Sequence, residues 1–521
     1  MSDAYFDGCS MGDLVIRAVQ RGGSRVAFIS GEYSVTYQTM GQELSRMAQY
    51  LEAIGLKHGD TIATLSVNRP EAFFVSAAGY LLGLRVLWLN PMASADDHLY
   101  QLEDAQVRCL MVDPHSFGDR AQALCQHLVK PPLLMGLGPW AGHKDLLREM
   151  QAYSPQRLES RSRSADACVL IYTGGTTGKP KGVLHSHRVQ VAMVMMEMAD
   201  FDWPANPCFL AMTPITHAAG TLIMPVLMQG GTVVMHAGFD VKHFCALVQR
   251  HRVNCTFMVP TMIYVLLDSP VRQDHDLSSL QTIMYGAAPM STTRLREGMA
   301  ELGPIFMQLY GQSEAPMAIA VLHKQEHDPI NYPHRLSSCG TPVVGIQLQL
   351  LDDDGHEVAL GEVGEIAVRG PLVMEGYINK PEENARALRH GWLYSGDLAR
   401  MDDDGYLYIV DRSKDMIITG GFNVFPREIE DVLGTHPAVA AVAVVGVPHE
   451  KWGEAVHAVV VWRPGQTADW GELADLVREK KGAVHVPKMF HAVDQLTTTG
   501  LGKVDKKAMR AQLSIQPSLG H

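Results

Sequence analysis

The chain has 521 residues, which is longer than one hydrophobic core usually supports, so at least two domains are expected. Hydrophobic residues make up 46% of it and charged residues 19%, a balance typical of a folded protein rather than a disordered one. The formal net charge is −12, and no dense stripe of Lys and Arg offsets it. Binding to nucleic acid or to an anionic membrane surface is therefore not expected.

The apolar pattern suggests neither a signal peptide nor a membrane span. The first residues, MSDAYFDGCSMGDLV, include acids and lack an apolar core. The apolar stretch at residues 221–235 is interrupted by Pro225, Gln229 and two glycines, well short of the roughly 18 apolar residues of a span. The eight cysteines are scattered singly without a C-x-x-C pair, which disfavours a disulfide framework and a structural zinc site. A reducing cytoplasm is the expected location.

In chain order, helical and strand-like patterns alternate through the first half. Residues 44–54 have helical spacing, residues 61–67 resemble a strand, and residues 71–84 predict a helix that ends near Gly83. Residues 107–112 form a short apolar strand pattern. Between about 168 and 311 the buried-strand candidates are VLIYT, GTVVMHA, CTFMV and TIMYG. This alternation predicts an α/β fold with parallel sheets covered by helices.

The pattern changes after about Cys339. Strand signals at residues 347–352, 364–369 and 406–410 are separated by DDDG turns, and they predict a small antiparallel β-barrel or sheet at about 339–411. The DDDG turns lack the alternating D-x-D-x-D-G spacing of an EF-hand loop. Hairpin turns are therefore expected there rather than calcium sites.

A second change comes at the charged segment DRSKD, residues 411–415. It is followed by a helix pattern at 426–433, strand patterns at 439–447 and 455–462, and a helix pattern at 470–481. These elements predict a compact α+β domain. We therefore expect one domain at residues 1–411 and a second at 412–521.

The run YTGGTTGKPKG at residues 172–182 follows a buried strand and precedes a segment that could be helical. Glycines let backbone amides approach an anion closely, while threonine hydroxyls and lysine ammonium groups add donors and charge. The spacing does not fit a P-loop, which would need Gly at Thr173 and Ser or Thr at Pro180. A flexible surface loop is the simpler alternative, but this density of Gly, Thr and Lys beside a strand favours another type of phosphate site.

Six segments in this order resemble the adenylate-forming superfamily, which includes acyl-CoA synthetases, firefly-type luciferases and the adenylation domains of peptide synthetases. They are residues 172–182, PITHAAG at 214–220, YGQSE at 310–314, YSGD at 394–397, DRSKD at 411–415 with GGFNVFP at 420–426, and LGK at 501–503. The resemblance extends to about Arg510, nearly the whole chain. It implies a large N-terminal domain of two α/β subdomains plus the small β-barrel subdomain, followed by a small mobile α+β C-terminal domain.

The resemblance also implies the reaction. In this superfamily a carboxylate attacks ATP to give an acyl adenylate and pyrophosphate, and in the acyl-CoA ligases CoA then takes up the acyl group. The substrate's own carboxylate is the nucleophile, so the protein has only to neutralise phosphate charge and align the reactants. ATP, Mg²⁺, CoA and a small-molecule carboxylic acid are the implied cofactors and partners, and a homodimer is left open.

The nucleotide contacts follow from the resemblance residue by residue. The phosphate cradle is Thr173, Gly174, Gly175, Thr176, Thr177, Gly178 and Lys181. Tyr310 corresponds to the residue that stacks on adenine, and the strand end beside the ring corresponds to Gly286, Ala287, Ala288 and Pro289. The same segment continues with Gly311, Gln312 and Ser313, and Ser313 stands where a threonine near the α-phosphate is usual. Asp397 corresponds to the carboxylate that binds the ribose hydroxyls, and Arg412 to a second nucleotide contact.

The resemblance implies three catalytic residues, Lys503, Glu314 and His217. Lys503 corresponds to the lysine that bridges the α-phosphate and the substrate carboxylate, although its position alone would also suit a solvated tail. Glu314 corresponds to the Mg²⁺ ligand, with Thr176 as a second candidate ligand. By the resemblance, His217 corresponds to an aromatic or histidine position that gates the acyl pocket. A role as metal ligand or general base is not supported, because no second histidine or carboxylate lies at ligand spacing on that segment.

Other positions have a functional and a plain interpretation. Lys414 corresponds to the hinge about which the C-terminal domain rotates, or it is an ordinary linker charge. Gly420 and Gly421 correspond to a loop that borders the CoA tunnel, or they form a simple tight turn. His185 and His187 are expected to be solvent-facing helix residues. The chain departs from the usual pattern at Gly174, where serine is common, and at Thr497, where proline is usual.

Acyl-CoA ligase is the favoured function. The alternatives are transfer of the acyl group to a carrier protein, luciferase chemistry, and a nucleotide-binding regulator with a dead site, which the intact candidate residues argue against. The candidate acyl-pocket segments are residues 214–220, 259–264, 286–288 and 309–317. They are largely apolar and contain no Arg or Lys to pair a second carboxylate, so a hydrophobic monocarboxylate is expected, whether fatty, aromatic or alicyclic.

Overall fold

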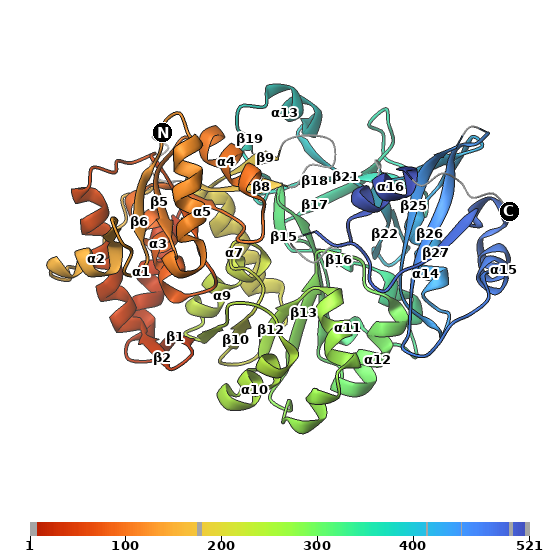
Figure 1. Ribbon diagram of the computed structural model, residues 1–521, viewed down its shortest axis with the longest axis horizontal. Coiled ribbons are helices and arrows are strands. Elements are labelled where there is room, and N and C mark those ends of the chain that lie inside the picture. The colour runs from red at the N-terminus through yellow and green to blue at the C-terminus, as the bar shows by residue number, and fades with distance from the viewer. Residues whose placement is uncertain (1–7, 174–179, 413–414, 450, 500–503, 516–521) are drawn as a thin grey trace.

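The computed structural model describes residues 8–173, 180–412, 415–449, 451–499 and 504–515 (Figure 1). Three sheets belong to the part of the chain that ends near residue 412, and a fourth sheet with its helices forms the remainder, at the right of Figure 1. A mixed α/β fold with a large N-terminal part and a smaller C-terminal part is thus confirmed.

The first sheet has the strand order β19-β9-β8-β4-β3-β5-β6-β7. Its strands are β3 (Thr61–Leu65), β4 (Arg85–Trp88), β5 (Val107–Val112), β6 (Leu133–Gly136), β7 (Lys144–Asp145), β8 (Ala167–Thr173), β9 (Lys181–Ser186) and β19 (Gly376–Tyr377). The run from β8 to β7 is parallel, whereas β9 and β19 are antiparallel. The expected helix after the glycine-rich run is therefore wrong: that segment is β9, which pairs with β8 so that Thr173 lies opposite Lys181.

The second sheet has the order β16-β15-β14-β13-β12-β10-β11-β1-β2. Its strands are β1 (Val26–Ser30), β2 (Tyr33–Thr36), β10 (Cys208–Ala211), β11 (Thr232–Met235), β12 (Cys255–Met258), β13 (Thr282–Gly286), β14 (Phe306–Gln312), β15 (Ala315–Leu322) and β16 (Thr341–Pro342). The strands from β1 to β14 are parallel, and β2, β15 and β16 are antiparallel at the edges. Parallel pairing needs crossover segments, which the helices supply.

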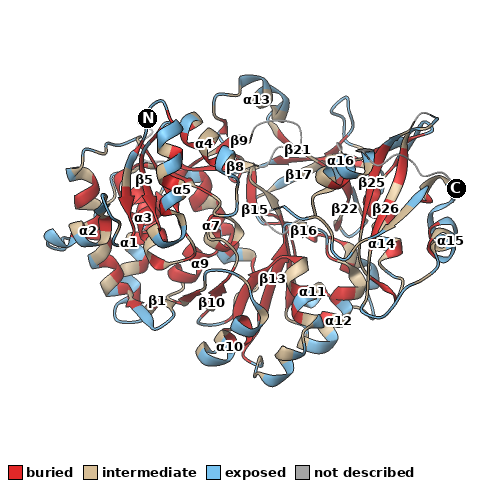
Figure 2. Ribbon diagram, in the orientation of Figure 1, coloured by how far each residue is buried: buried red, intermediate tan, exposed pale blue. Residues whose placement is uncertain are grey.

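These helices cover the two sheets and lie between them. They are α1 (Met11–Gly22), α2 (Tyr37–Ala53), α3 (Pro70–Leu82), α4 (Ala95–Asp104), α5 (Pro114–His127), α6 (Leu146–Glu149), α7 (His187–Asp200), α8 (Ala218–Thr221), α9 (Ile223–Met228), α10 (Val241–His251), α11 (Pro260–Asp268) and α12 (Thr292–Leu302). The largest apolar cluster joins residues of both sheets with α1, α3, α7 and α9. In α3 every residue except Glu71 is buried, as expected of a helix that is apolar on all sides (Figure 2).

The third sheet is antiparallel and has the order β17-β18-β21-β20, with β22 paired to β21. Its strands are β17 (Gln347–Leu351), β18 (Gly364–Arg369), β20 (Leu388–Arg389), β21 (Trp392–Met401) and β22 (Leu407–Arg412), and α13 (Pro381–Ala387) precedes β20. The DDDG segment at 402–405 joins β21 to its antiparallel neighbour β22. It is therefore the expected hairpin turn.

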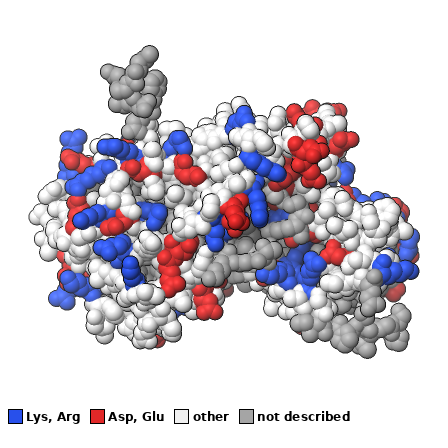
Figure 3. Space-filling view, turned by 90° about the horizontal axis from the view of Figure 1, so that it is seen from above, with Lys and Arg blue, Asp and Glu red and all other residues white. Residues whose placement is uncertain are grey.

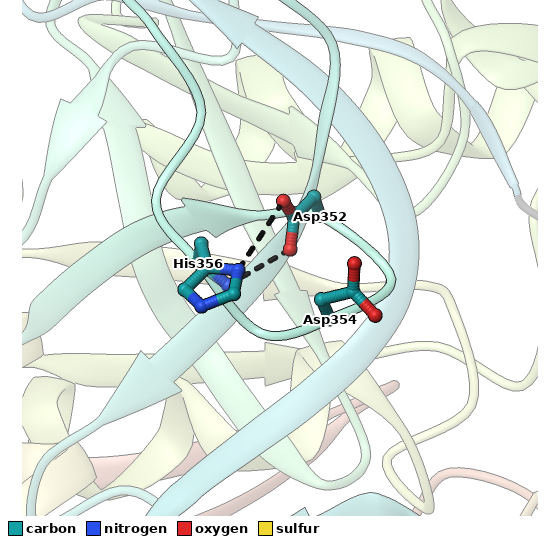
Figure 4. Close-up of side chains that lie close together, drawn as sticks. All are labelled: Asp352, Asp354 and His356. Carbon is teal, nitrogen blue, oxygen red and sulfur yellow. Dashed lines mark hydrogen bonds and ion pairs between the residues drawn. The ribbon is translucent and has the colours of Figure 1, made fainter.

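The DDDG segment at 352–355 also forms a turn, which Figure 4 shows in detail. Ligand atoms of Asp352, Asp354 and His356 lie within 4.8 Å of one another, but all three residues are exposed. The Asp352 backbone amide donates to the His356 carbonyl at 2.8 Å, and the His356 amide donates to the Asp352 carboxylate at 2.8 Å. Gly355 closes the turn with a positive φ of 83°. These hydrogen bonds account for the cluster as a turn.

The C-terminal part has a sheet of order β24-β23-β26-β25, with β27 parallel to β26. Its elements are β23 (Ile417–Thr419), β24 (Phe422–Val424), α14 (Pro426–Leu433), β25 (Val439–His449), β26 (Gly453–Trp462), α15 (Trp470–Lys481), β27 (Met489–Ala492) and α16 (Lys506–Ile515). The chain passes from the third sheet to this one between Arg412 and Ile417. The two helices α14 and α15 have the bounds that the sequence pattern predicts.

Figure 3 shows the surface seen from above. Acidic and basic side chains are interspersed over most of this face, and acids gather most densely at its upper right. The visible part of this face thus offers no continuous track of positive charge of the kind that a nucleic-acid backbone needs. Within the described ranges, every helix is too short or too polar to cross a bilayer.

Helix α7 carries a carboxyl group in the apolar core. Glu197 is fully buried, and neither of its oxygens has a hydrogen-bond partner among the described residues. Burial raises the pKa of Glu197 well above its usual value of 4.5, so the folded protein keeps this group protonated. As the pH rises past 4.5 the unfolded chain loses this proton while the folded chain retains it. Stability is therefore lost as the pH rises.

We expect Glu197→Gln to remove this loss, because the amide is neutral at every pH. The difference in unfolding free energy between the variant and the wild type should grow in the variant's favour above about pH 5, by at most about 1.4 kcal/mol per pH unit. Denaturant unfolding of both proteins between about pH 4.5 and 7.5 measures it. A difference that stays constant with pH would show that Glu197 is already ionised in the folded state.

Candidate active site

The candidate residues gather beside the carboxyl ends of two strands of the second sheet. Strands β13 and β14 are parallel neighbours of the second sheet, and residues 286–289 and 310–313 lie at their carboxyl ends. Ligand sites in open α/β sheets form at this edge. Strands β21 and β22 of the third sheet bring Asp397 and Arg412 to it, and β19 of the first sheet brings Tyr377.

The backbone at the ends of β13 and β14 is packed too closely for ordinary side chains. A Cβ atom on Gly286 would lie 2.3 Å from the carbonyl oxygen of Leu309, and one on Gly311 would lie 2.5 Å from the amide of Met317. Ala287 has a positive φ of 66°, which is uncommon for a residue other than glycine. These residues therefore form a tight wall of backbone rather than a cluster of functional groups.

Tyr310, Asp397 and Arg412 meet although they lie far apart in sequence. The Tyr310 hydroxyl donates to Asp397 Oδ2 at 2.7 Å, and Arg412 Nε lies 3.0 Å from Asp397 Oδ1. Asp397 and Arg412 are opposite each other in the β21–β22 register. Burial and the Asp397 carboxylate raise the pKa of Tyr310 well above its usual range, and Asp397 also raises the pKa of Arg412. The tyrosine is thus a neutral donor and the arginine a fixed cation.

Gln312 follows Tyr310 by two residues at the end of β14. Its Nε2 atom is buried and has no hydrogen-bond partner among the described residues. Buried amide groups are normally hydrogen-bonded, so this donor is an exception within the described part of the site.

Glu314 is held by a tyrosine that the sequence analysis missed. The Tyr377 hydroxyl donates to Glu314 Oε1 at 2.7 Å, and the Lys181 ammonium lies 4.1 Å from the centre of the Tyr377 ring. Burial, and then Glu314, raise the pKa of Tyr377. Tyr377 belongs to the two-residue strand β19, which no periodic sequence pattern could reveal. It connects a candidate metal ligand with the end of the candidate phosphate loop.

His185 and His187 are not solvent-facing helix residues, as the sequence analysis expected. Both are fully buried, His185 on β9 and His187 at the start of α7. Gln190 Nε2 donates to His185 Nδ1 at 2.8 Å, and His185 Nε2 in turn donates to the Ser313 carbonyl at 2.8 Å. Burial lowers the pKa of each histidine to about 4. His185 is therefore a neutral link that fixes the backbone of Ser313.

His217 precedes α8, and its Nδ1 lies 2.9 Å from the Thr216 hydroxyl. The segment that carries it is fastened to the first sheet by Asn68, a buried residue in the β3–α3 connection. Asn68 Nδ2 donates to the Thr213 carbonyl at 2.8 Å, and Asn68 Oδ1 accepts from the Ile215 amide at 2.9 Å. This clamp holds the candidate acyl-pocket segment between the two large sheets. Asn68 could not be recognised from the sequence, since a polar residue in a loop gives no signal of its own.

Gly420 and Gly421 form the two-residue turn between β23 and β24. Their φ angles are 58° and 84°, and Thr419 pairs with Phe422 across the turn. Positive φ at both positions is what such a hairpin turn requires, so the tight-turn interpretation accounts for the glycine pair. The Gly420 amide donates to the Trp452 carbonyl at 2.9 Å, which fastens the turn to the connection between β25 and β26.

Several predicted site residues lie outside the described part of the chain. They are Gly174, Gly175, Thr176, Thr177, Gly178, Lys414 and Lys503. Thr173 and Lys181, which flank the candidate phosphate loop, are described and lie opposite each other in adjacent strands.

Comparisons with known proteins agree with this arrangement. Residues 15–378 match the family of AMP-binding enzymes, and residues 428–503 match the AMP-binding enzyme C-terminal domain. FadD8 of Mycobacterium tuberculosis, a medium/long-chain-fatty-acid–CoA ligase, is 44% identical over 515 residues, with 96% of this chain and 90% of that protein covered. A feruloyl-CoA synthase of an Amycolatopsis species is 34% identical over 502 residues, covering 96% of this chain and 98% of its own.

The fold also matches that of a solved structure. The amide bond synthetase McbA from Marinactinospora thermotolerans superposes with a TM-score of 0.89 at 32% identity, covering 96% of this chain and 99% of that one. Sequence and fold thus agree over almost the entire length. The chain therefore belongs to the AMP-binding enzyme family, within the adenylate-forming superfamily that its six motifs resemble.

Proposed function

We propose that this protein joins a hydrophobic monocarboxylic acid to CoA in two steps, with ATP as the energy source. The observation that carries the proposal is the meeting of Tyr310, Asp397 and Arg412 at the sheet edge, where Ser313 and Glu314 follow directly after the strand that carries Tyr310. The reaction is that of an AMP-forming acid–CoA ligase, as in the relatives named above.

In the first step a carboxylate oxygen of the acid attacks the α-phosphorus of ATP, and pyrophosphate leaves. Asp397 accepts hydrogen bonds from the ribose hydroxyls, and Arg412 and Tyr310 hold the Asp397 carboxylate in position. Ser313 is placed near the α-phosphate by the His185 link to its carbonyl. Thr173 and Lys181 flank the loop that binds the outer phosphates, and Lys503 neutralises charge at the reacting atoms.

Glu314 is the residue that would hold Mg²⁺. A carboxylate oxygen is the ligand that this ion prefers, and the Tyr377 hydroxyl fixes the orientation of the Glu314 side chain. The ion supplies positive charge that offsets the charge of the phosphates when bound. Thr176 is proposed as a second ligand.

In the second step the thiol of CoA attacks the acyl carbonyl and AMP leaves. We place the junction of the two domains at residues 411–412, with Lys414 as the hinge, because the chain changes sheets between Arg412 and Ile417. Rotation at this hinge would bring the Gly420–Gly421 turn to the route of the pantetheine arm. The acid, ATP and CoA are the proposed small-molecule partners, in the cytoplasm.

The surface beside the Gly420–Gly421 turn suits the nucleotide end of CoA. The Trp452 indole is stacked on His449 with ring centres 4.3 Å apart, and the ammonium groups of Lys488 and Lys451 lie 5.1 and 5.8 Å from the Trp452 ring centre. Two ammonium groups held at an aromatic ring can attract the phosphates of a nucleotide. This cluster supports CoA as the acyl acceptor.

The test of the proposed function is a panel of carboxylic acids with ATP and added Mg²⁺. Pyrophosphate release reports the first step, and CoA consumption reports the second. We expect both with fatty, aromatic or alicyclic monocarboxylates, and neither after chelation of Mg²⁺. Pyrophosphate release without CoA consumption would overturn the CoA half of the proposal and point to another acceptor. No pyrophosphate with any acid would overturn the whole.

Replacing Lys488 by alanine should weaken CoA use alone. We expect the KM for CoA to rise about tenfold, because a cation that attracts phosphate is removed at an exposed site. The rate of acid-dependent exchange between pyrophosphate and ATP should not change. Lys480→Ala, which removes an exposed lysine of α15, is the matched control. An equal loss of rate in both half-reactions would contradict a role for Lys488 in CoA binding alone.

A further inference from the structure

A narrow cavity lies beside the segment that carries His217. Its walls come from β3, α3 and β4 on one side and from α7 and residues 215–224 on the other. Its volume is about 30 Å³, room for a water molecule or two, or for one small substituent. The Asn68 clamp holds these walls together, because Asn68 fastens the Ile215 backbone to the end of the first sheet.

The cavity is connected to the candidate active site in two ways. Thr216 lines it and contacts the His217 ring through its hydroxyl, at 2.9 Å. Gln190 also lines it and donates to His185, which donates to the Ser313 carbonyl. Each link is a short hydrogen bond between buried or half-buried groups. The cavity therefore borders the proposed acyl gate directly, and it is linked to the Ser313 backbone through Gln190 and His185.

The polar groups of the cavity are neutral. Among the described residues that line it, none is an Asp, Glu, Lys, Arg or His. The Thr64 hydroxyl is buried and has no hydrogen-bond partner among the described residues. Trp88 Nε1 donates to Ser76 Oγ at 3.2 Å, which leaves the Ser76 proton available for another acceptor. Because a buried hydroxyl without a partner is costly, this cavity favours an occupant that carries an uncharged oxygen.

The cavity can also adapt to an occupant. Met11, Met193 and Met224 line it, and methionine side chains are flexible enough to shift by rotamer changes. A small terminal group could therefore enter without a change in the backbone.

We propose that this cavity binds the end of the acyl group remote from the carboxylate, and that it favours acids with a neutral oxygen, hydroxyl or keto, at that end. This inference rests on the proposed acid–CoA ligase function. It names a class within the hydrophobic monocarboxylates: acids with an apolar body and one uncharged oxygen at the far end. Thr64 is the specificity-determining residue, since its hydroxyl is the unpaired one.

The test compares straight-chain acids with their ω-hydroxy counterparts over a range of chain lengths. At the length where the tail reaches the cavity, Thr64→Val should lower the ratio of kcat/KM values, ω-hydroxy acid over plain acid, about three- to tenfold. Valine has nearly the shape of threonine, so the fold should be kept. Thr256→Val, at a buried strand threonine outside the cavity, should leave the ratio unchanged.

A second variant tests, independently of the Thr64 hydroxyl, whether the acyl tail reaches the cavity. Ala72→Val narrows the cavity, and it should slow acids long enough to reach it while shorter acids keep their rates. If the kcat/KM values of both variants equal those of the wild type for every acid, the cavity holds water only and the proposal fails. That outcome differs from failure of the ligase function, in which the wild type itself would consume no CoA with any acid.

Discussion

Replacing Lys503 by alanine should lower the rate of acyl-adenylate formation about 10²- to 10³-fold, the typical cost of losing a preorganised charge at the reacting atoms. The substrate carboxylate and the α-phosphate of ATP are both negative when they approach, so a cation between them stabilises the transition state most. Thioester formation from a preformed acyl adenylate should change little, because the proposed domain rotation would carry the lysine away from the reacting atoms before that step. Exchange of pyrophosphate with ATP measures the first step, and CoA consumption with synthetic acyl adenylate measures the second.

Lys507→Ala is the matched control, since Lys507 is an exposed lysine on α16, four residues further on. It should retain both half-reactions. If Lys503→Ala slows both half-reactions equally, the lysine is not specific to adenylation, and the domain rotation assumed for it has no kinetic support.

The second large effect is expected at Asp397. Asp397→Ala should lower kcat/KM for ATP about 10²-fold, because it removes the proposed ribose contact and leaves Tyr310 and Arg412 without their common carboxylate. Asp397→Asn keeps an acceptor oxygen, so its kcat/KM for ATP should fall less, about tenfold. Calorimetric titration with AMP measures the binding part of the effect without any chemistry.

The control for Asp397 is Asp403→Ala, which removes a carboxylate from the exposed turn of the same β21–β22 hairpin. AMP affinity should be unchanged in this variant. Should Asp397→Ala lower the melting temperature but bind AMP as the wild type does, the carboxylate would be a structural residue and not a nucleotide ligand.

The sequence was informative where structure depends on local patterns. Strand β5 and helices α14 and α15 lie at the predicted bounds, because their periodicity and terminal residues are contained in the segments themselves. The six motifs placed Tyr310, Asp397 and Arg412 in one functional group, and the structure brings these three together. Here resemblance supplied what periodicity could not, since the three residues lie on different strands.

The predictions that failed concern residues whose structure is set by contacts with segments far away in the sequence. The segment at 181–186 is a strand because β8 and β19 flank it, and β19 comes nearly 200 residues later in the chain. Histidine is polar enough to suggest the surface, yet His185 is buried because Gln190 and Ser313 satisfy both ring nitrogens. Asn68 and Tyr377 gave no signal, because their importance lies in the groups that they meet across sheets.

The strand order has a consequence for synthesis on the ribosome. Strand β1 pairs with β11, so about 200 further residues must be synthesised before the β1–β2 hairpin can join the second sheet. The first sheet is completed only by β19. The first sheet can therefore be completed only when nearly 380 residues have emerged, and the third sheet only after β22, which ends at Arg412. By contrast, β23 to β27 lie in one continuous stretch and can assemble at once. A nascent chain of this enzyme should depend on chaperones for most of its elongation, and its last hundred residues should need them least.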